Sequence, residues 1–405
     1  MNGEKRIEWV SQFMPVLNKI KDDYERDKPL KGLSIGMALH VEPKTCFLVR
    51  TLEAGGADVS ITGCNPLSTQ DDVVEALKAT GTKAYAKHGQ SRDEYYDSLN
   101  KILDSNPDAV IDDGCDLILL LHKERKELLE KIKGACEETT TGIHRLKAMA
   151  KDGALKFPVM NVNDAKCKHL FDNFYGTGES TLSSIMTTTN LILSGKTFVV
   201  GGYGYCGRGI ATKARGLGAH VIVTEVDPVK ALQARMDGYT VMPMAEAVKK
   251  ADFVVTATGM RDIVTPEHFK AMKNKCILAN SGHFDIEVDL EGLEEITKKE
   301  NVNEDIDAYT FPNGKKVFVL AQGRLVNLAT SKGLGHPIEI MDLSFCLQAL
   351  GVKYVLENKL EPGVHSIPKS IDDLAAQMKL EAMGIKKDSL TREQEEYGSA
   401  WEVGT

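Results

Sequence analysis

The chain has 405 residues, more than one hydrophobic core usually organises, so two domains are expected and three are possible. Its composition, 42% hydrophobic and 27% charged, is that of an ordinary soluble globular protein. A formal net charge of −8, without a basic patch interleaved with aromatic residues, argues against nucleic-acid binding. The chain has no apolar run of about 18 residues, so we expect no membrane span.

The N-terminal sequence MNGEKRIEWV is charged and has no apolar core, so we expect no signal peptide. The eight cysteines are scattered, without C-x-x-C or other paired spacing, which argues against a zinc site and a disulfide framework. We therefore expect reduced thiols, a cytoplasmic location and no bound metal.

Short β-rich runs alternate with helical patterns in the first part of the chain. Apolar residues at helical spacing predict an amphipathic helix over 5–25, perturbed by Pro15. The segments that follow are predicted as strands (33–39, 58–64, 82–87 and 108–113) and as helices (44–57 and 69–81). Such alternation predicts a parallel, doubly wound sheet.

A second alternating series follows a helix predicted over 180–195, whose start is the predicted hinge. Beyond residue 335 the pattern is helical, and Thr391 with Gln394 forms a capping box for a last helix. The predicted fold class is therefore α/β, with two doubly wound Rossmann-like domains joined by a hinge, and a helical C-terminal tail. The strands of the second series are predicted at 196–202, 220–226, 252–258, 275–282 and 316–322, and the long later helix at 341–359.

Residues 201–209, GGYGYCGRG, match G-x-G-x-x-G at Gly202, Gly204 and Gly207. The motif follows a predicted strand and opens a helix, and the next strand ends in Glu225, 18 residues after Gly207. Glycines of this kind allow a pyrophosphate to approach the helix N-terminus, and the acidic group suits the adenosine ribose of NAD rather than NADP. Lys230 could partly offset that preference. A glycine-rich turn without a ligand is the structural alternative.

Polar side chains gather after several predicted strands, in 111–117, 137–144, 161–180, 281–285 and 333–337, and His40 follows the first strand. Each segment alone could be a helix cap, a turn or a satisfied core residue. Together, at strand ends around an interdomain cleft, they predict an acid–base site built on bound NAD. A lysine buried among carboxylates there could have a lowered pKa and act as a base.

These segments, in this order, resemble the S-adenosylhomocysteine hydrolase family over about residues 8–400. The motifs that carry the resemblance are HVEPKT, CNPLSTQDD, DDGCDL, EETTTGIH, NVNDAKCKHLFDN, GYGYCGRG, TEVDP, SGHFD, QGRLVNL and GHP. The resemblance implies a homotetramer whose protomers bind a small thioether substrate. It implies a substrate domain over 1–176 that resumes over 335–370, an NAD domain over 177–334, and an oligomerisation tail over 371–405.

The resemblance also implies a mechanism. Tightly held NAD oxidises the 3′-hydroxyl of the nucleoside ribose, a base removes the acidified C4′ proton, and homocysteine leaves from C5′. Water then adds, and the stored hydride reduces the ketone. By motif, Lys168 would deprotonate the 3′-hydroxyl, with Asp172 beside the ribose diol and Glu138 at the 2′-hydroxyl. Asp113 and His40 would be the acid–base pair at C4′ and at the sulfur or water.

For the cofactor, the resemblance places His283 beside NAD and substrate, Asn327 at the nicotinamide amide, His336 at the second hinge, and Glu225 at the adenosine ribose. The other implied cofactor contacts are Thr139, Thr140, Thr141, Asn173, Gly202, Gly204, Tyr205, Cys206, Gly207, Arg208, Gly209, Lys230, Ser281 and Gly282.

Several positions depart from the eukaryotic members of that family. Thr177 stands where they have a cysteine, Lys230 where they usually have asparagine, and the tail ends in AWEVGT without their lysine and tyrosine. We therefore expect NAD to exchange more readily here, and the pattern is similar to that of archaeal and thermophilic-bacterial members.

The predicted base pocket departs as well, with Glu42 and Lys44 in place of a threonine and a glutamate. Glu42 could accept from the amino group of adenine, whereas Lys44 would suit the carbonyl of hypoxanthine. The sequence favours S-adenosyl-L-homocysteine as substrate and leaves S-inosyl-L-homocysteine open. A net NAD-dependent dehydrogenase and a non-enzymatic NAD-binding regulator are the more distant alternatives.

Overall fold

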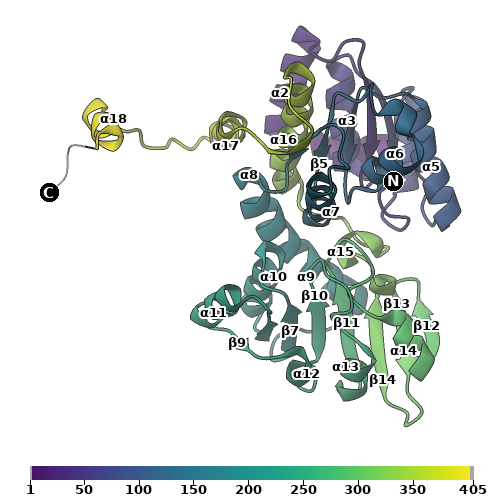
Figure 1. The fold of residues 1–405 in the computed structure, drawn as a ribbon. Coiled ribbons are helices and arrows are strands. Elements are labelled where there is room, and N and C mark those ends of the chain that lie inside the picture. The colour runs from purple at the N-terminus through teal and green to yellow at the C-terminus, as the bar shows by residue number, and fades with distance from the viewer. Residues whose placement is uncertain (1, 402–405) are drawn as a thin grey trace.

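The computed structural model describes residues 2–401, in two α/β lobes that lie one above the other in Figure 1. Each lobe is built on one sheet with helices on both faces. The predicted fold class is confirmed.

The sheet of the first lobe is entirely parallel, as predicted. The strand order, β15-β6-β5-β4-β1-β2-β3, places β1 between β2 and β4, so the direction of winding reverses there. The strands are β1 Ser34–Ala38, β2 Asp58–Thr62, β3 Lys83–Ala84, β4 Ala109–Asp112, β5 Gly134–Glu137, β6 Pro158–Asn161 and β15 Gly363–Ser366.

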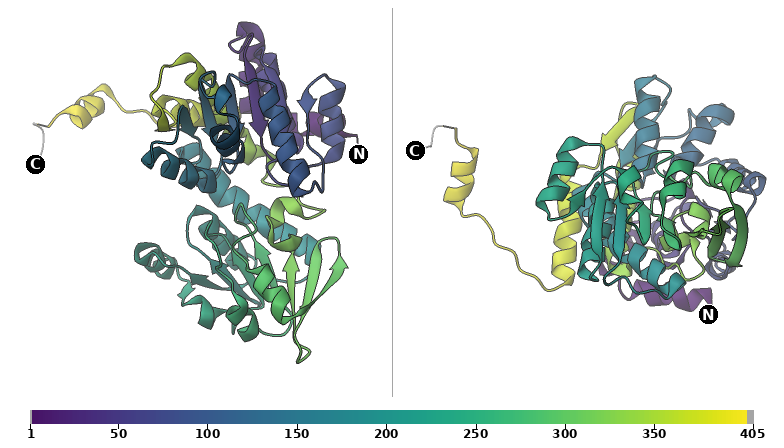
Figure 2. Two further views of the ribbon diagram at one scale, coloured as in Figure 1. Left: turned by 45° about the vertical axis from the view of Figure 1, so that its right-hand side comes forward. Right: turned by 90° about the horizontal axis from the view of Figure 1, so that it is seen from below.

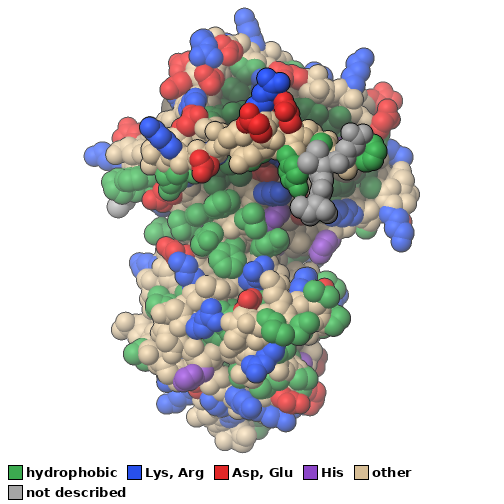
Figure 3. Space-filling view, turned by 90° about the vertical axis from the view of Figure 1, so that its left-hand side faces the viewer, with side chains coloured by type: hydrophobic (Ala, Val, Ile, Leu, Met, Phe, Trp, Pro, Cys, Tyr) green, Lys and Arg blue, Asp and Glu red, His purple; other side chains and the backbone are tan. Residues whose placement is uncertain are grey.

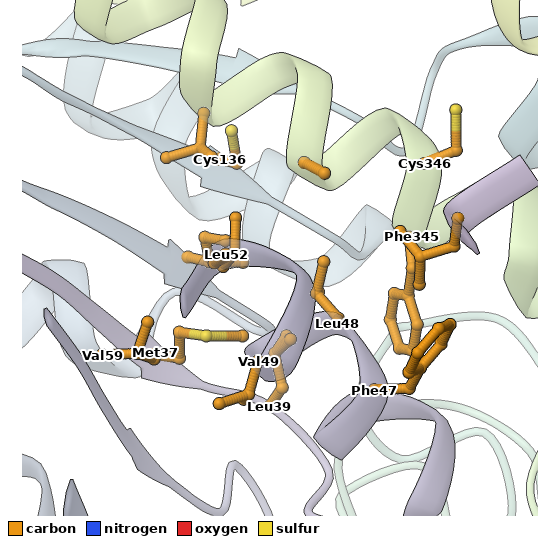
Figure 4. Packing of buried hydrophobic residues seen from close by; sticks show 14 of the residues in the cluster. Met37, Leu39, Phe47, Leu48, Val49, Leu52, Val59, Cys136, Phe345 and Cys346 are labelled. Carbon is orange, nitrogen blue, oxygen red and sulfur yellow. The ribbon is translucent and has the colours of Figure 1, made fainter. Parts of the chain in front are cut away.

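Alternate residues of these strands face two hydrophobic clusters, one on each side of the sheet. In the larger cluster, Leu48 and Leu52 of one helix pack between the strands and Phe345 of a helix far along the chain (Figure 4). The larger cluster is covered by α1 Gly3–Ser11, α2 Pro15–Asp27, α3 Pro43–Ala54, α4 Asp71–Ala79 and α16 Ile338–Glu357; the other by α5 Arg92–Asp104, α6 Asp116–Glu124, η1 Lys126–Leu128 and α7 Thr140–Lys151.

The single helix predicted over 5–25 is wrong, since two helices meet there. Pro15 is the first residue of α2, where its missing N–H costs nothing. The carboxylate of Asp342 accepts from the N–H groups of Val16 and Leu17, which satisfies the new helix start.

The second sheet has the order β12-β13-β14-β11-β10-β7-β8-β9, and β7 lies between β8 and β10. Its last three strands along the chain are antiparallel to their neighbours, apart from the parallel pair β11–β14. The hairpin β12–β13 was not predicted because β12 is exposed throughout and polar except for Val302. The strands are β7 Thr197–Gly201, β8 His220–Thr224, β9 Thr240–Val241, β10 Phe253–Thr256, β11 Cys276–Asn280, β12 Lys298–Asn303, β13 Ile306–Thr310 and β14 Lys316–Leu320.

One continuous helical run joins the lobes, formed by α8 Lys166–Lys168, the π-helix η2 His169–Gly176 and α9 Thr177–Thr189. The boundary predicted at 176/177 falls inside this run, and α9 ends six residues before the predicted residue 195. The chain returns through α16, which packs on α2 and α3, and β15 pairs with β6. The other helices of the second lobe are α10 Tyr205–Gly216, α11 Pro228–Met236, α12 Met244–Ala247, α13 Pro266–Ala271, α14 Leu290–Ile296, η3 Ala321–Gly323 and α15 Val326–Ala329.

The C-terminal segment leaves the body after α17 Lys369–Ala382, which packs on α16. Residues 384–400 are exposed, and α18 Arg392–Ser399 stands clear of both lobes in Figures 1 and 2. The predicted capping box of Thr391 and Gln394 is confirmed. Among the residues described, no helix combines the length and apolarity needed to cross a membrane.

Candidate active site

The carboxyl ends of the two sheets face each other across a cavity of about 130 Å³. This cavity adjoins a groove of about 1410 Å³ that runs over the second sheet. Parallel α/β sheets place their ligands at such ends, beside the strands where winding reverses. The two spaces share the lining residues Thr139, Thr140, Asn173, Cys206, Ser281 and His283.

A buried lysine lies at the centre of the cavity wall. Lys168 Nζ is 2.9 Å from Asp172 Oδ1, 2.9 Å from Asn173 Oδ1 and 3.2 Å from Glu138 Oε1. The wider turn of the π-helix η2 brings both Asp172 and Asn173, four and five residues further on, to the same ammonium group. Three predicted site residues are thus in direct contact with Lys168.

Helix α16 supplies two partners that sequence reasoning missed. Ser344 Oγ donates to Asp172 Oδ2 at 2.7 Å, and Gln348 Nε2 donates to Glu138 Oε2 at 2.5 Å. Their four-residue spacing on a largely apolar helix was the available signal, because residues four apart share one helix face. Both carboxylates are thereby fixed from the side opposite Lys168.

The charges in this cluster shift one another's pKa. Burial lowers the pKa of Lys168, but the carboxylates of Asp172 and Glu138 outweigh burial and raise it. The predicted lowering of the lysine pKa is therefore wrong in its net direction. Burial raises the pKa of Glu138 to about 7, against the opposing effect of Lys168. At neutral pH, Lys168 keeps its proton and Glu138 is the group poised to exchange one.

Asp113 lies between two imidazoles at the other side of the cavity. Its Oδ2 is 3.4 Å from His40 Nε2 and its Oδ1 is 3.5 Å from His283 Nδ1. His40 Nδ1 is 2.7 Å from Ser68 Oγ, which fixes the ring. Burial lowers the pKa of His40 to about 4 despite the Asp113 carboxylate, so His40 is neutral at neutral pH and able to accept a proton.

His336, predicted at the second hinge, contacts the Lys168 cluster directly. Its Nδ1 is 3.1 Å from Asp172 Oδ1, and its Nε2 is 3.3 Å from Thr177 Oγ1. His336 therefore links the Lys168 cluster to Thr177 at the start of α9.

Glu42 and Lys44 line the cavity at the start of α3, and both are buried. Glu42 is the N-cap, and its oxygens accept from the N–H groups of Lys44 and Thr45 and from Thr45 Oγ1. Lys44 Nζ lies 2.8 Å from Glu42 Oε2 and donates to the carbonyl of Leu334 at 2.8 Å. An ammonium group has three N–H donors, so one remains for a ligand.

The groove over the second sheet fits a dinucleotide. Gly202 has a φ of 94°, and a Cβ on Gly207 would lie 2.0 Å from the Gly202 carbonyl oxygen, so the turn requires glycine at both positions. Gly204, at the start of α10, has no neighbour within 4 Å of its Cβ position, which leaves a cradle at a helix N-terminus. Glu225 directly follows β8, and its carboxylate accepts from the N–H of Tyr203 in the glycine turn.

The cavity also fits the carboxamide end of NAD. Asn327 is buried and donates from Nδ2 to Ser180 Oγ at 2.9 Å, while its Oδ1 has no hydrogen-bond partner among the described residues. A buried amide oxygen without a partner is costly, and a carboxamide N–H would satisfy it.

Most predicted cofactor residues line the groove or the cavity, and two do not. Gly207 faces Gly202, and Gly209 packs against helix η2, where its Cβ would lie 1.9 Å from the Phe174 carbonyl oxygen. Lys230 is exposed at the groove edge. The remaining groove residues are Thr139, Thr140, Thr141, Asn173, Gly202, Gly204, Tyr205, Cys206, Arg208, Glu225, Ser281, Gly282 and His283.

Gly204→Ala is expected to weaken NAD binding about 10- to 100-fold, because one added methyl group overpacks a tight contact by about 1–3 kcal/mol. The unliganded chain has room for that methyl, so the Tm without NAD should not fall. Equilibrium dialysis with NAD measures the affinity. Gly216→Ala, also in α10 with an open Cβ position, is the matched control, and equal affinities for the two variants would contradict the assignment.

Comparison with known proteins agrees with this geometry. Residues 1–130 match the family model described as S-adenosyl-L-homocysteine hydrolase, and residues 173–333 match its NAD binding domain. The chain is 57% identical to the S-inosyl-L-homocysteine hydrolase of Methanothermobacter thermautotrophicus, over 100% of this chain and 97% of that relative. It is 54% identical to the adenosylhomocysteinase of Thermotoga maritima, over 99% of each chain.

A solved structure shares the fold at low identity. A dipicolinate synthase chain from Bacillus halodurans superposes with a TM-score of 0.50 at 14% identity, covering 82% of this chain and 100% of that one. With relatives above 50% identity along its whole length, the chain belongs to the S-adenosyl-L-homocysteine hydrolase family and carries that family's NAD-binding domain.

Proposed function

We propose that this NAD-using enzyme hydrolyses the C5′–S bond of a purine nucleoside joined to L-homocysteine, releasing the nucleoside and the free thiol. The observation that carries the proposal is the Lys168 cluster, which lies beside Asp113 and His40 and adjoins the dinucleotide groove. An acid–base cluster at each end of one small cavity suits a reaction that moves protons at two neighbouring ribose positions.

NAD bound in the groove supplies reversible oxidation of the ribose at C3′. Lys168 relays the proton of the 3′-hydroxyl to Glu138, which it contacts at 3.2 Å, so it gives one proton as it receives another and remains charged. Asp172, fixed by Ser344 and His336, orients the diol. Burial of the whole cluster excludes water from these proton transfers.

Asp113 and His40 serve the second half of the reaction. One of them removes the C4′ proton, and the pair protonates the departing sulfur and later deprotonates the attacking water. His40 is neutral at neutral pH because burial lowers its pKa to about 4, and the Asp113 carboxylate opposes that lowering and favours a proton on the ring. His283 reaches Asp113 from the second lobe, with its Nδ1 3.5 Å from Asp113 Oδ1.

The rate of 3′-oxidation is expected to rise with pH through about 7. Burial raises the pKa of Glu138 to that value, and only its ionised form, present above pH 7, receives a proton from Lys168. Stopped-flow absorbance at 340 nm across pH 5.5–8.5, a range of about 3 units around that pKa, measures the step. Glu138→Gln should abolish this rise of the rate with pH. Glu53→Gln, which replaces another carboxyl group whose pKa burial raises, should keep it. A rise that persists in Glu138→Gln would contradict the assignment.

The preferred nucleoside is proposed to be inosine rather than adenosine. The oxygens of Glu42 already accept three hydrogen bonds, from Lys44 N, Thr45 N and Thr45 Oγ1, and Oε2 is ion-paired with Lys44 Nζ at 2.8 Å, so the four acceptor positions of the carboxylate are engaged. The free N–H of Lys44 remains to donate, and hypoxanthine offers a carbonyl where adenine offers an amino donor. The sequence alone favoured the adenosyl substrate; this saturation, and the relatives named S-inosyl-L-homocysteine hydrolase at 52–57% identity, favour the inosyl one.

Thiol release from the two substrates tests this preference. We expect kcat/KM for S-inosyl-L-homocysteine to exceed that for S-adenosyl-L-homocysteine. Lys44→Gln should reduce the ratio about 10- to 100-fold, the worth of one charged hydrogen bond of about 1.5–3 kcal/mol. Lys28→Gln, which removes a lysine that also donates to a backbone carbonyl, is the control. An unchanged ratio in Lys44→Gln would reject the pocket assignment.

The exposed C-terminal arm supports a proposed homotetramer. Residues 384–400 bear the exposed apolar side chains Ile385, Leu390 and Tyr397 on a segment that stands away from its own lobes. Figure 3 shows further hydrophobic side chains gathered at the waist between the lobes. Sedimentation equilibrium measures the assembly.

All eight cysteines are free, which supports the proposed cytoplasmic location.

A further inference from the structure

Glu137 is a buried carboxyl group that the proposed reaction does not use. It is the last residue of β5, and its register partner in β4 is Asp112. It is fully buried and lines neither the cavity nor the groove. The next two residues, Glu138 and Thr139, do line the cavity.

One oxygen of Glu137 ties two active-site loops together. Oε1 accepts from the N–H of Gly114 at 2.9 Å and from the N–H of Thr139 at 3.0 Å. Gly114 directly follows Asp113, and Thr139 directly follows Glu138. The loops that carry the two ribose-facing carboxylates are therefore joined through a single acceptor atom.

The surroundings of Glu137 are built for its side chain. A Cβ at Gly142, in α7, would lie 2.2 Å from the carboxyl carbon of Glu137, so α7 can pass this close to Glu137 only with glycine at position 142. Asp112, on the neighbouring strand, holds the same turn from inside by accepting from the N–H groups of Asp113 and Ile118.

Gly114 in turn sets the place of His283. A Cβ on Gly114 would lie 2.3 Å from His283 Nε2, so the imidazole rests directly on this glycine. The Gly114 carbonyl accepts from Arg145 Nη1 at 2.6 Å. Glu137 thus binds the N–H of Gly114, and Arg145 binds its carbonyl. These two contacts fix the glycine on which His283 rests beside Asp113.

We propose that Glu137 is a positioning residue that clamps Gly114 and Thr139 and so fixes Asp113, Glu138 and the seat of His283. The proposal rests on the proposed function for the roles of those residues. Burial, and then the Asp112 carboxylate, raise the pKa of Glu137 well above its usual value, in keeping with the uncharged form. The charged groups around it are Asp112, Asp113, Asp116 and Arg145.

Two substitutions separate positioning from simple stability. Glu137→Gln keeps an uncharged oxygen acceptor and should retain kcat within about threefold. Glu137→Ala removes the clamp and should slow exchange of the C4′ hydrogen with deuterated solvent by about 10²-fold, the cost of a displacement of about 1 Å in a catalytic group. Bound-NADH formation at 340 nm should fall less, because Lys168 is held by Asp172 and Asn173 of η2.

Asp108→Ala is the matched control for stability. Asp108 directly precedes β4, at the end of that strand opposite Asp112, and accepts from the N–H of Ser34 at 2.9 Å. It should lower the Tm without changing the C4′ exchange rate. The proposal would be overturned if the C4′ exchange rate of Glu137→Ala equalled that of Asp108→Ala. It would also be overturned if Glu137→Gln exchanged as slowly as Glu137→Ala.

A readout without substrate separates this proposal from the proposed function. Amide hydrogen exchange at Gly114 and Thr139 should be slow in the wild-type chain and in Glu137→Gln, and at least about 10-fold faster in Glu137→Ala, since each loses its acceptor. Unchanged exchange at both amides overturns the clamp. Absence of thiol release from either nucleoside substrate by the wild-type enzyme overturns the proposed function instead.

Discussion

Lys168→Met is expected to lower kcat about 10³-fold, within the range that a positioned acid–base group contributes. Without the amine, the 3′-hydroxyl has no group to receive its proton, so no absorbance from bound NADH should develop on mixing with substrate. Lys168 contacts Asp172, Asn173 and Glu138, and no other lysine or arginine pairs with Asp172 or Glu138 among the described residues. Thiol release and single-turnover absorbance at 340 nm measure the two effects.

The control for Lys168→Met is Lys213→Met, which removes a lysine paired with Glu179 on the surface. The substitution at Lys168 also leaves buried carboxylates without their cation, so thermal melting is recorded for both variants. Lys168→Arg, which restores a cation, distinguishes the two causes: recovered Tm without recovered kcat assigns proton transfer to the amine. Bound NADH forming at the wild-type rate in Lys168→Met would contradict the assignment.

Asp113→Asn is expected to give the opposite signature. Thiol release should fall about 10²- to 10³-fold, again the range for acid–base catalysis, while bound NADH rises toward one equivalent per protomer. In the proposed mechanism, oxidation at C3′ depends on the Lys168 cluster, but removal of the C4′ proton and loss of sulfur depend on Asp113 and His40, which lie 3.4 Å apart. The enzyme should therefore stall after the first step.

The same stopped-flow traces and thiol assay test Asp113→Asn. Asp252→Asn is its control, since Asp252 accepts a backbone N–H at the far edge of the second sheet. Equal losses of bound NADH and of thiol release would place Asp113 in the oxidation step and reject the division of roles.

Much of this site was predictable from the sequence because its residues come directly after or close to the ends of parallel strands. His40, Asp113 and Glu138 come immediately after or next to the ends of parallel strands, whose carboxyl ends meet at one edge. The glycine motif was predictable for a similar reason, since Gly202 and Gly207 must approach each other in the turn after β7. Local patterns and sheet geometry were sufficient there.

The other features could not be predicted from the sequence. They depend on contacts between distant segments, on distances between charged groups, or on a strand without an apolar pattern. Ser344 and Gln348 reach Asp172 and Glu138 across 172 and 210 residues, which no spacing rule links. The net direction of the Lys168 pKa depends on how closely two carboxylates approach, a distance that the sequence does not contain. The hairpin β12–β13 has no apolar alternation in its outer strand.

The central claim is that the enzyme borrows a hydride and returns it in each cycle. Absorbance at 340 nm and free thiol are followed together while the wild-type enzyme turns over an excess of S-inosyl- or S-adenosyl-L-homocysteine. The account predicts continuous release of homocysteine thiol, with NADH never above one equivalent per protomer. NADH that accumulates in step with turnover would contradict it and identify a net dehydrogenase.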